Sequence, residues 1–111
     1  MEFNEYQKRA STTADFTGRP GEYPLMYSCM GLAGETGEVI EKVKKVIRNN
    51  GGKMSEVERE AIKQEIGDVL WYLSQVARFC DIAFDDAAKA NVEKLADRRA
   101  RGMIRSEGDA R

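Results

Sequence analysis

The chain has 111 residues, which is enough for one domain. Hydrophobic residues make up 41% and charged residues 33%, a balance typical of a globular protein. The formal net charge of -1 argues against a broadly basic nucleic-acid binder. The chain contains no histidine, which excludes hydrolases of the Ser-His-Asp and Cys-His types and zinc sites with histidine ligands.

The two cysteines and the N-terminus point to a reducing compartment. Cys29 and Cys80 are too few for a zinc cluster or a disulfide scaffold, and both fall in helical apolar patterns, so we expect buried free thiols. The first residues, MEFNEYQKRA, lack the apolar run of a signal peptide. No stretch reaches the roughly 20 apolar residues of a membrane span. We therefore expect a cytoplasmic protein without a membrane partner.

Two loops divide the first half of the chain into helices. Residues 2–16 carry apolar side chains at three- and four-residue spacing, which predicts a first helix. The segment TGRPGEYP ends it, and Pro24 suits the first turn of a second helix that we expect over about residues 24–48. The run NNGG at residues 49–52 predicts the end of this helix.

Capping signals mark the helices of the second half. Ser55 followed by Glu58 forms a capping box, which predicts the start of a third helix. The fourth helix is expected over about residues 84–101, with Gly102 as its stop.

No segment shows sustained strand alternation, so the sequence predicts an all-α bundle. We expect one domain over residues 1–102 and a flexible C-terminal tail over residues 103–111.

A short pattern of Glu, any residue, Gly, acid, Val and an aliphatic residue occurs at residues 35–40 and again at 65–70. At about 100° per residue, Glu35 lies about 80° from the centre of its apolar stripe and Glu38 about 60° further round. Glu65 and Asp68 hold the same two angles on the third helix. If the stripes face each other, four carboxylates converge and need a counter-charge. The alternative is that these are ordinary solvated acids.

Magnesium is the expected counter-charge, with Mn²⁺ as a possible substitute, because hard divalent cations prefer oxygen ligands. Gly37 and Gly67 each precede the second acid of a pair. A glycine inside a helix costs about 1 kcal/mol relative to alanine, so these positions suggest a close approach to the backbone by another helix or by a ligand.

Three blocks of sequence resemble the MazG-like, all-α nucleoside triphosphate pyrophosphohydrolases. They are GLAGETGEVIEKVKK at 31–45, KQEIGDVLWYL at 63–73 and NVEKLADRRARG at 91–102. The family motif is Glu-Glu-x-x-Glu, a spacer, then Glu-x-x-Asp. Gly34 replaces the first glutamate, which leaves the number of metal ions open. The remaining motif acids correspond to Glu35, Glu38, Glu65 and Asp68.

The resemblance implies a four- to five-helix bundle that assembles as a homodimer or homotetramer. It also implies hydrolysis of an NTP or dNTP between the α and β phosphates, giving the monophosphate and pyrophosphate, as nucleotide-pool house-cleaning. The four motif acids would hold Mg²⁺ against the triphosphate, and one carboxylate would take a proton from the attacking water. Glu38 is our first choice for this base.

Further residues are expected to contact the substrate or to pack nearby. Asn91, Lys94 and Arg98 share one face of the fourth helix and match the family's Asn-x-x-Lys-x-x-x-Arg stretch, so we assign them to phosphate or sugar. Their simple alternative is a solvated basic helix end. Tyr72, one turn after Asp68, is expected to line the pocket. We expect Trp71 to pack on another helix or on a second subunit. Within one chain, Trp71 and Phe79 are expected to be poorly covered. Lys42 is expected to pair with Glu38, one turn earlier on the same helix.

Two other functions fit the sequence. The chain could be a non-catalytic helical dimerisation or regulatory module whose acids keep the bundle soluble, or a metal-binding protein without turnover. Composition does not separate these alternatives from a nucleotide pyrophosphohydrolase.

Overall fold

The computed structural model describes residues 1–15 and 23–102, and this part of the chain consists of four helices without strands. The predicted all-α class is confirmed. The expected tail at 103–111 and most of the loop before Tyr23 lie outside the described residues. The helices are α1 (Phe3–Ser11), α2 (Pro24–Asn50), α3 (Glu56–Phe79) and α4 (Phe84–Ala100).

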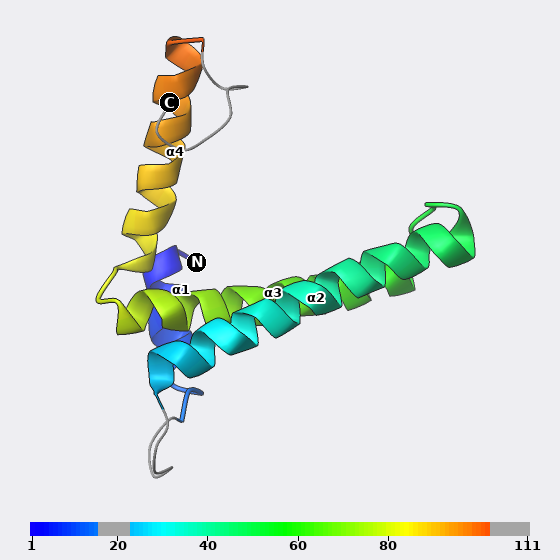
Figure 1. Ribbon diagram of the computed structural model, residues 1–111, viewed down its shortest axis with the longest axis horizontal. Coiled ribbons are helices and arrows are strands. Elements are labelled where there is room, and N and C mark those ends of the chain that lie inside the picture. Colours follow the sequence, from blue (N-terminus) through cyan, green and yellow to red (C-terminus); the bar gives the residue numbers. More distant parts are fainter. Residues whose placement is uncertain (16–22, 103–111) are drawn as a thin grey trace.

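Helices α2 and α3 form a long antiparallel hairpin that dominates the molecule (Figure 1). The NNGG run ends α2 as predicted. Gly51 and Gly52 have φ angles of 60° and 86°, a left-handed conformation that glycine adopts without steric cost. The Gly52 N–H donates to the Val46 carbonyl at 3.3 Å, which satisfies a carbonyl group of the last turn.

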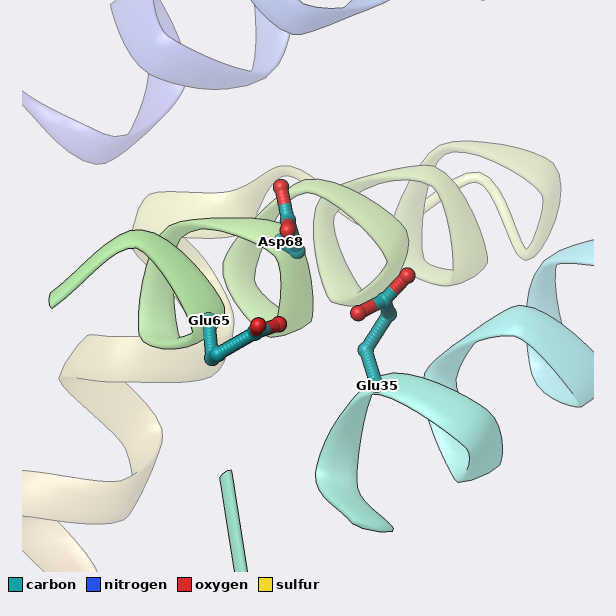
Figure 2. Close-up of side chains that lie close together, drawn as sticks. All are labelled: Glu35, Glu65 and Asp68. Atoms are coloured by element: carbon teal, nitrogen blue, oxygen red, sulfur yellow. The ribbon is translucent and has the colours of Figure 1, made fainter. Parts of the chain in front are cut away.

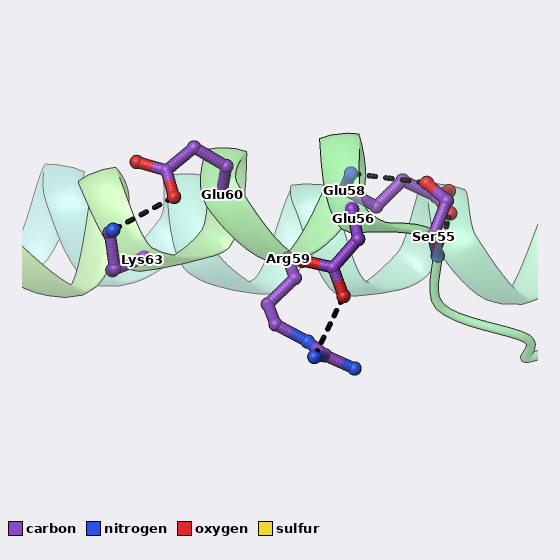
Figure 3. Close-up of polar contacts among 6 residues, drawn as sticks. All are labelled: Ser55, Glu56, Glu58, Arg59, Glu60 and Lys63. Carbon is purple, nitrogen blue, oxygen red and sulfur yellow. Dashed lines mark hydrogen bonds and ion pairs between the residues drawn. The ribbon is translucent and has the colours of Figure 1, made fainter.

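The predicted capping box begins α3 (Figure 3). The Glu58 backbone N–H donates to Ser55 Oγ at 3.2 Å, and the Ser55 backbone N–H donates to Glu58 Oε1 at 2.9 Å. An N-cap of this kind stabilises a helix by about 1 kcal/mol. It fixes the residue at which α3 starts, and hence where Glu65 and Asp68 lie along the helix.

Helix α1 joins the open end of the hairpin, where α3 ends, to α4. The Gln7 side-chain amide donates to the Ser74 carbonyl at 3.2 Å and to the Ile82 carbonyl at 3.0 Å, and its oxygen accepts from the Phe84 backbone N–H at 3.2 Å. The rings of Phe3 and Phe84 meet edge-on at 5.2 Å. Helix α4 contacts α1 and α3 but not α2, and it points away from the hairpin (Figure 1).

The single chain is open and leaves apolar surface uncovered. Its radius of gyration is 17.1 Å, whereas a compact chain of this length would have about 13 Å. Met26, Met30, Ile40 and Ile47, each more than 60% exposed, share one face of α2, which we call the α2 apolar face. Ile40 and Ile47 are exposed because, within the described part of the chain, α2 packs against α3 alone.

Both cysteines are free but exposed, so the expectation that they are buried is wrong. Cys29 lies on α2, which is covered on one side only, and Cys80 lies one residue beyond the end of α3. Trp71 and Phe79 are partly buried, so the uncovered apolar surface lies elsewhere than expected. Among the described residues, no helix combines the length and apolar character that a membrane crossing needs.

Candidate metal and substrate site

Three carboxylates meet between the two long helices. Glu35 comes from α2, and Glu65 and Asp68 come from α3, where their spacing puts them on one side of the helix. Their side chains point toward one another (Figure 2). One oxygen from each lies within 4.8 Å of the other two. The convergence that the sequence predicts for four acids is therefore seen for three of them.

The surroundings of Glu35 raise the pKa of its carboxyl group. Partial burial raises the pKa of the Glu35 carboxyl, and the charges of Asp68, Glu65 and Glu38 raise this pKa further, as does a hydrogen bond with the Glu65 side chain. Ionised Glu35 is therefore destabilised by its neighbours when no cation is bound.

Glu38 lies near this cluster but outside it. Its side chain is exposed, and its carboxylate is not one of the three that converge, although its charge reaches Glu35. Glu38 is about 60° further round α2 than Glu35, in keeping with its three-residue spacing. Its roles as metal ligand and as base stay predictions.

The three-carboxylate cluster fits a small divalent cation. Two oxygens bound to one Mg²⁺ lie at most about 4.2 Å apart, twice the usual Mg–O distance of about 2.1 Å. The observed limit of 4.8 Å is close to this value, so small side-chain rotations are enough to bring the oxygens onto one ion. Carboxylate oxygens belong to the hard oxygen donors that Mg²⁺ and Mn²⁺ prefer.

Lys42 provides a weak counter-charge. Its Nζ lies 3.7 Å from Glu65 Oε1, across the hairpin, so the expected pairing with Glu38 is not the one that forms. Glu41 points elsewhere, because it pairs with Lys44 at 2.8 Å, and this hydrogen bond lowers the Glu41 pKa. One distant ammonium group does not neutralise three carboxylates, which leaves room for a cation.

A hollow of about 290 Å³ opens beside the acids and is lined by Glu35, Asp68, Trp71 and Tyr72. Tyr72 thus lies beside the acids, and its contact with a substrate stays a prediction. Burial raises the pKa of the Tyr72 phenol, and the charges of Tyr27, Glu35 and Asp68 raise it further. The phenol therefore keeps its proton at neutral pH and can donate a hydrogen bond into the hollow.

Two aromatic residues at the site were not assigned to it from the sequence. Trp71 lines the hollow, meets the Tyr72 ring edge-on at 5.0 Å and donates its indole N–H to Thr13 Oγ1 at 2.9 Å. Burial raises the pKa of the Tyr6 phenol on α1, and the charge of Asp68 raises this pKa further. The three-residue spacing from Asp68 to Trp71 was a usable signal, whereas nothing in the sequence connects Tyr6 to the acids.

The expected phosphate contacts lie on α4, away from the three-carboxylate cluster in one protomer. Asn91 lines a separate apolar hollow with residues such as Phe3 and Leu70. Lys94 is exposed, whereas Arg98 is only 2% exposed in the single chain. Because α4 does not contact α2, the protomer does not bring this trio to Glu35. Its role stays a prediction.

The fold and the site together define an all-helical protein with a cluster of three carboxylates between two long helices. Residues 28–102 match the family described as the MazG nucleotide pyrophosphohydrolase domain. The Gene 37 protein of Mycobacterium phage L5 is 38% identical over 115 aligned residues, which cover 100% of both chains. No solved structure gives a significant match. The chain belongs to the MazG nucleotide pyrophosphohydrolase family.

Replacing Glu35 tests the electrostatics of the site. We expect Glu35→Gln to raise the thermal unfolding midpoint of the metal-free protein by at most a few degrees, because it removes a repelled charge. Excess Mg²⁺ should raise the midpoint of the unsubstituted protein and not that of the variant. Differential scanning fluorimetry measures both effects.

The matched control is Glu60→Gln, which removes an exposed α3 acid that pairs with Lys63 at 2.8 Å. This variant should keep the full Mg²⁺-dependent rise. An undiminished rise in Glu35→Gln would contradict the assignment of Glu35 to the cation.

Proposed function

We propose that this chain hydrolyses nucleoside triphosphates between the α and β phosphates, releasing the monophosphate and pyrophosphate. Mg²⁺, or Mn²⁺ in its place, would be held by Glu35, Glu65 and Asp68, with Glu38 as a fourth candidate ligand. The observation that carries this proposal is the convergence of three carboxylates beside a hollow with an aromatic wall. Membership of the family supports the reaction class.

Charge explains why a cation belongs to this reaction. A triphosphate is strongly anionic and is repelled by three carboxylates, so it can approach them only with positive charge in between. A divalent cation held by Glu35, Glu65 and Asp68 would supply that charge and would polarise the α-phosphoryl group. The carboxylates of α2 and α3 would fix its position, because both helices are held by their packing along the hairpin.

Proton transfer falls to a carboxylate outside the converging set. Glu38 is exposed, lies one turn from Glu35 and is not one of the three converging acids. It is therefore free to accept a proton from the water that attacks the α phosphorus. Tyr72 donates from the wall of the hollow to the nucleotide, and its protonated phenol suits this contact.

A second protomer completes the proposed site. In one protomer α4 lies away from α2, so we assign Asn91, Lys94 and Arg98 to the phosphates or sugar of a nucleotide bound by a neighbouring copy. The α2 apolar face offers the surface for a homodimer or homotetramer. House-cleaning of the nucleotide pool in the cytoplasm is the role that fits this activity.

A non-catalytic helical module remains the rival function, since the same α2 apolar face would also serve a purely structural dimer. The deciding measurement is pyrophosphate release by the pure protein from a panel of NTPs and dNTPs with Mg²⁺. We expect monophosphate and pyrophosphate in equal amounts from at least one nucleotide, and no product when the metal is chelated. A folded protein that releases no pyrophosphate from any nucleotide would favour the module.

Two substitutions test the assigned acids. Asp68→Asn and Glu38→Gln should each lower turnover by at least about a hundredfold, because one removes a ligand and the other the base. Circular dichroism should show intact helices in both. Glu60→Gln is the control and should retain full activity, since its carboxylate lies on the solvent side with Lys63. Full activity in Asp68→Asn would contradict the assignment of Asp68 as a metal ligand.

Assembly is tested by sedimentation. We expect a species of two or four chains of 12.5 kDa each. Ile47→Lys should shift this species toward the monomer, because it places a charge on the α2 apolar face. Gln64→Lys adds the same charge at an exposed α3 position and should leave the assembly unchanged. A monomeric unsubstituted protein would contradict the proposed assembly.

A further inference from the structure

The ring of Tyr72 lies directly against the backbone of α2 at Gly31. A Cβ atom added to Gly31 would lie 2.5 Å from Tyr72 Cδ1 and Cζ, and closer still to Cε1. Ordinary contacts between carbon atoms are about 3.5–4.0 Å long. The absent side chain of Gly31 is therefore the space that the Tyr72 ring occupies.

This close approach is specific to Gly31. A Cβ at Gly34 or Gly37, on the same helix, or at Gly67 on α3, would meet nothing within 4 Å in the described part of the chain. The sequence pattern pointed to Gly37 and Gly67, and neither is approached within the protomer. Glycine weakens a helix relative to alanine, and at Gly31 the contact with Tyr72 gives a reason for it.

The Tyr72 ring is also held by a second aromatic residue. Trp71 meets it edge-on with an interplanar angle of 84°. Trp71 is held in turn by its hydrogen bond to Thr13 at the end of α1. A methyl group at Gly31 would therefore displace the ring or push α2 and α3 apart.

The contact lies next to the three-carboxylate cluster. Gly31 is one turn before Glu35 on α2, and Tyr72 is one turn after Asp68 on α3. We propose that Gly31 is a positioning residue, whose missing side chain seats Tyr72 so that the phenol contacts the nucleotide from the wall of the hollow. This inference rests on the proposed function for its substrate, while the contact between Gly31 and the Tyr72 ring is a property of the folded chain.

The test uses four variants of the full chain: Gly31→Ala, Gly34→Ala, Tyr72→Ala and the double variant Gly31→Ala/Tyr72→Ala. Gly34→Ala is the matched control, because it adds the same methyl group to the same helix in open space. Kinetics with Mg²⁺ and the preferred nucleotide give KM and kcat. The emission of Trp71, the single tryptophan of the chain, reports the position of the neighbouring Tyr72 ring without any substrate.

Gly31→Ala should raise KM about tenfold with a smaller change in kcat, as expected when one ground-state hydrogen bond is lost. Its Trp71 emission should shift, whereas Gly34→Ala should match the unsubstituted protein in both measurements. In the Tyr72→Ala background, Gly31→Ala should change kcat/KM less than about twofold, because the residue acts only through the ring.

Unaltered kinetics and unaltered Trp71 emission in Gly31→Ala would overturn the proposal, as would an equal loss of activity with and without the Tyr72 ring. If Gly31→Ala does not fold, removal of the ring in the double variant must restore folding. A double variant that also fails to fold would contradict the proposal that Gly31 positions Tyr72. If the unsubstituted protein hydrolyses no nucleotide, the proposed function fails and the substrate contact fails with it. The emission shift still decides whether Gly31 seats Tyr72.

Discussion

Repulsion among three carboxylates across a helical hairpin is the constraint on which the rest of the structure depends. Glu35, Glu65 and Asp68 are brought together by the packing of α2 against α3, and the resulting rise in the Glu35 pKa is the electrostatic cost. Lys42, at 3.7 Å from Glu65, offsets little of it. In the proposed function, a divalent cation among these oxygens would offset their repulsion, and stability and chemistry would then depend on the same three residues.

The surroundings of the acids are organised by contacts that reach across the molecule. Gly31 leaves space for the Tyr72 ring, Trp71 meets that ring edge-on, and Thr13 holds Trp71. Helices α2 and α3 and the residues just after α1 therefore all contribute to one wall. By contrast, α4 lies away from α2. The open shape and the α2 apolar face are consistent with a site that a second copy completes.

Local chemistry made the helices and the order of the acids predictable. The capping box at Ser55, the glycines after Asn50 and the spacing of Glu65 and Asp68 each act within a turn or two of one helix. Features that depend on how two helices lie against each other were missed. The exposure of Cys29, the partner of Lys42 and the approach at Gly31 depend on the geometry between α2 and α3, which one-dimensional spacing does not encode.

Titration of the metal-free protein with Mn²⁺, followed by electron paramagnetic resonance, tests most directly whether the converging oxygens hold a cation. We expect at least one bound Mn²⁺ per protomer, and loss of that binding when Glu35, Glu65 and Asp68 are all replaced by their amides in a protein that still folds. Undiminished Mn²⁺ binding by the triple variant, or no binding by the unsubstituted chain with or without a nucleoside triphosphate, would contradict the assignment of these carboxylates to a cation.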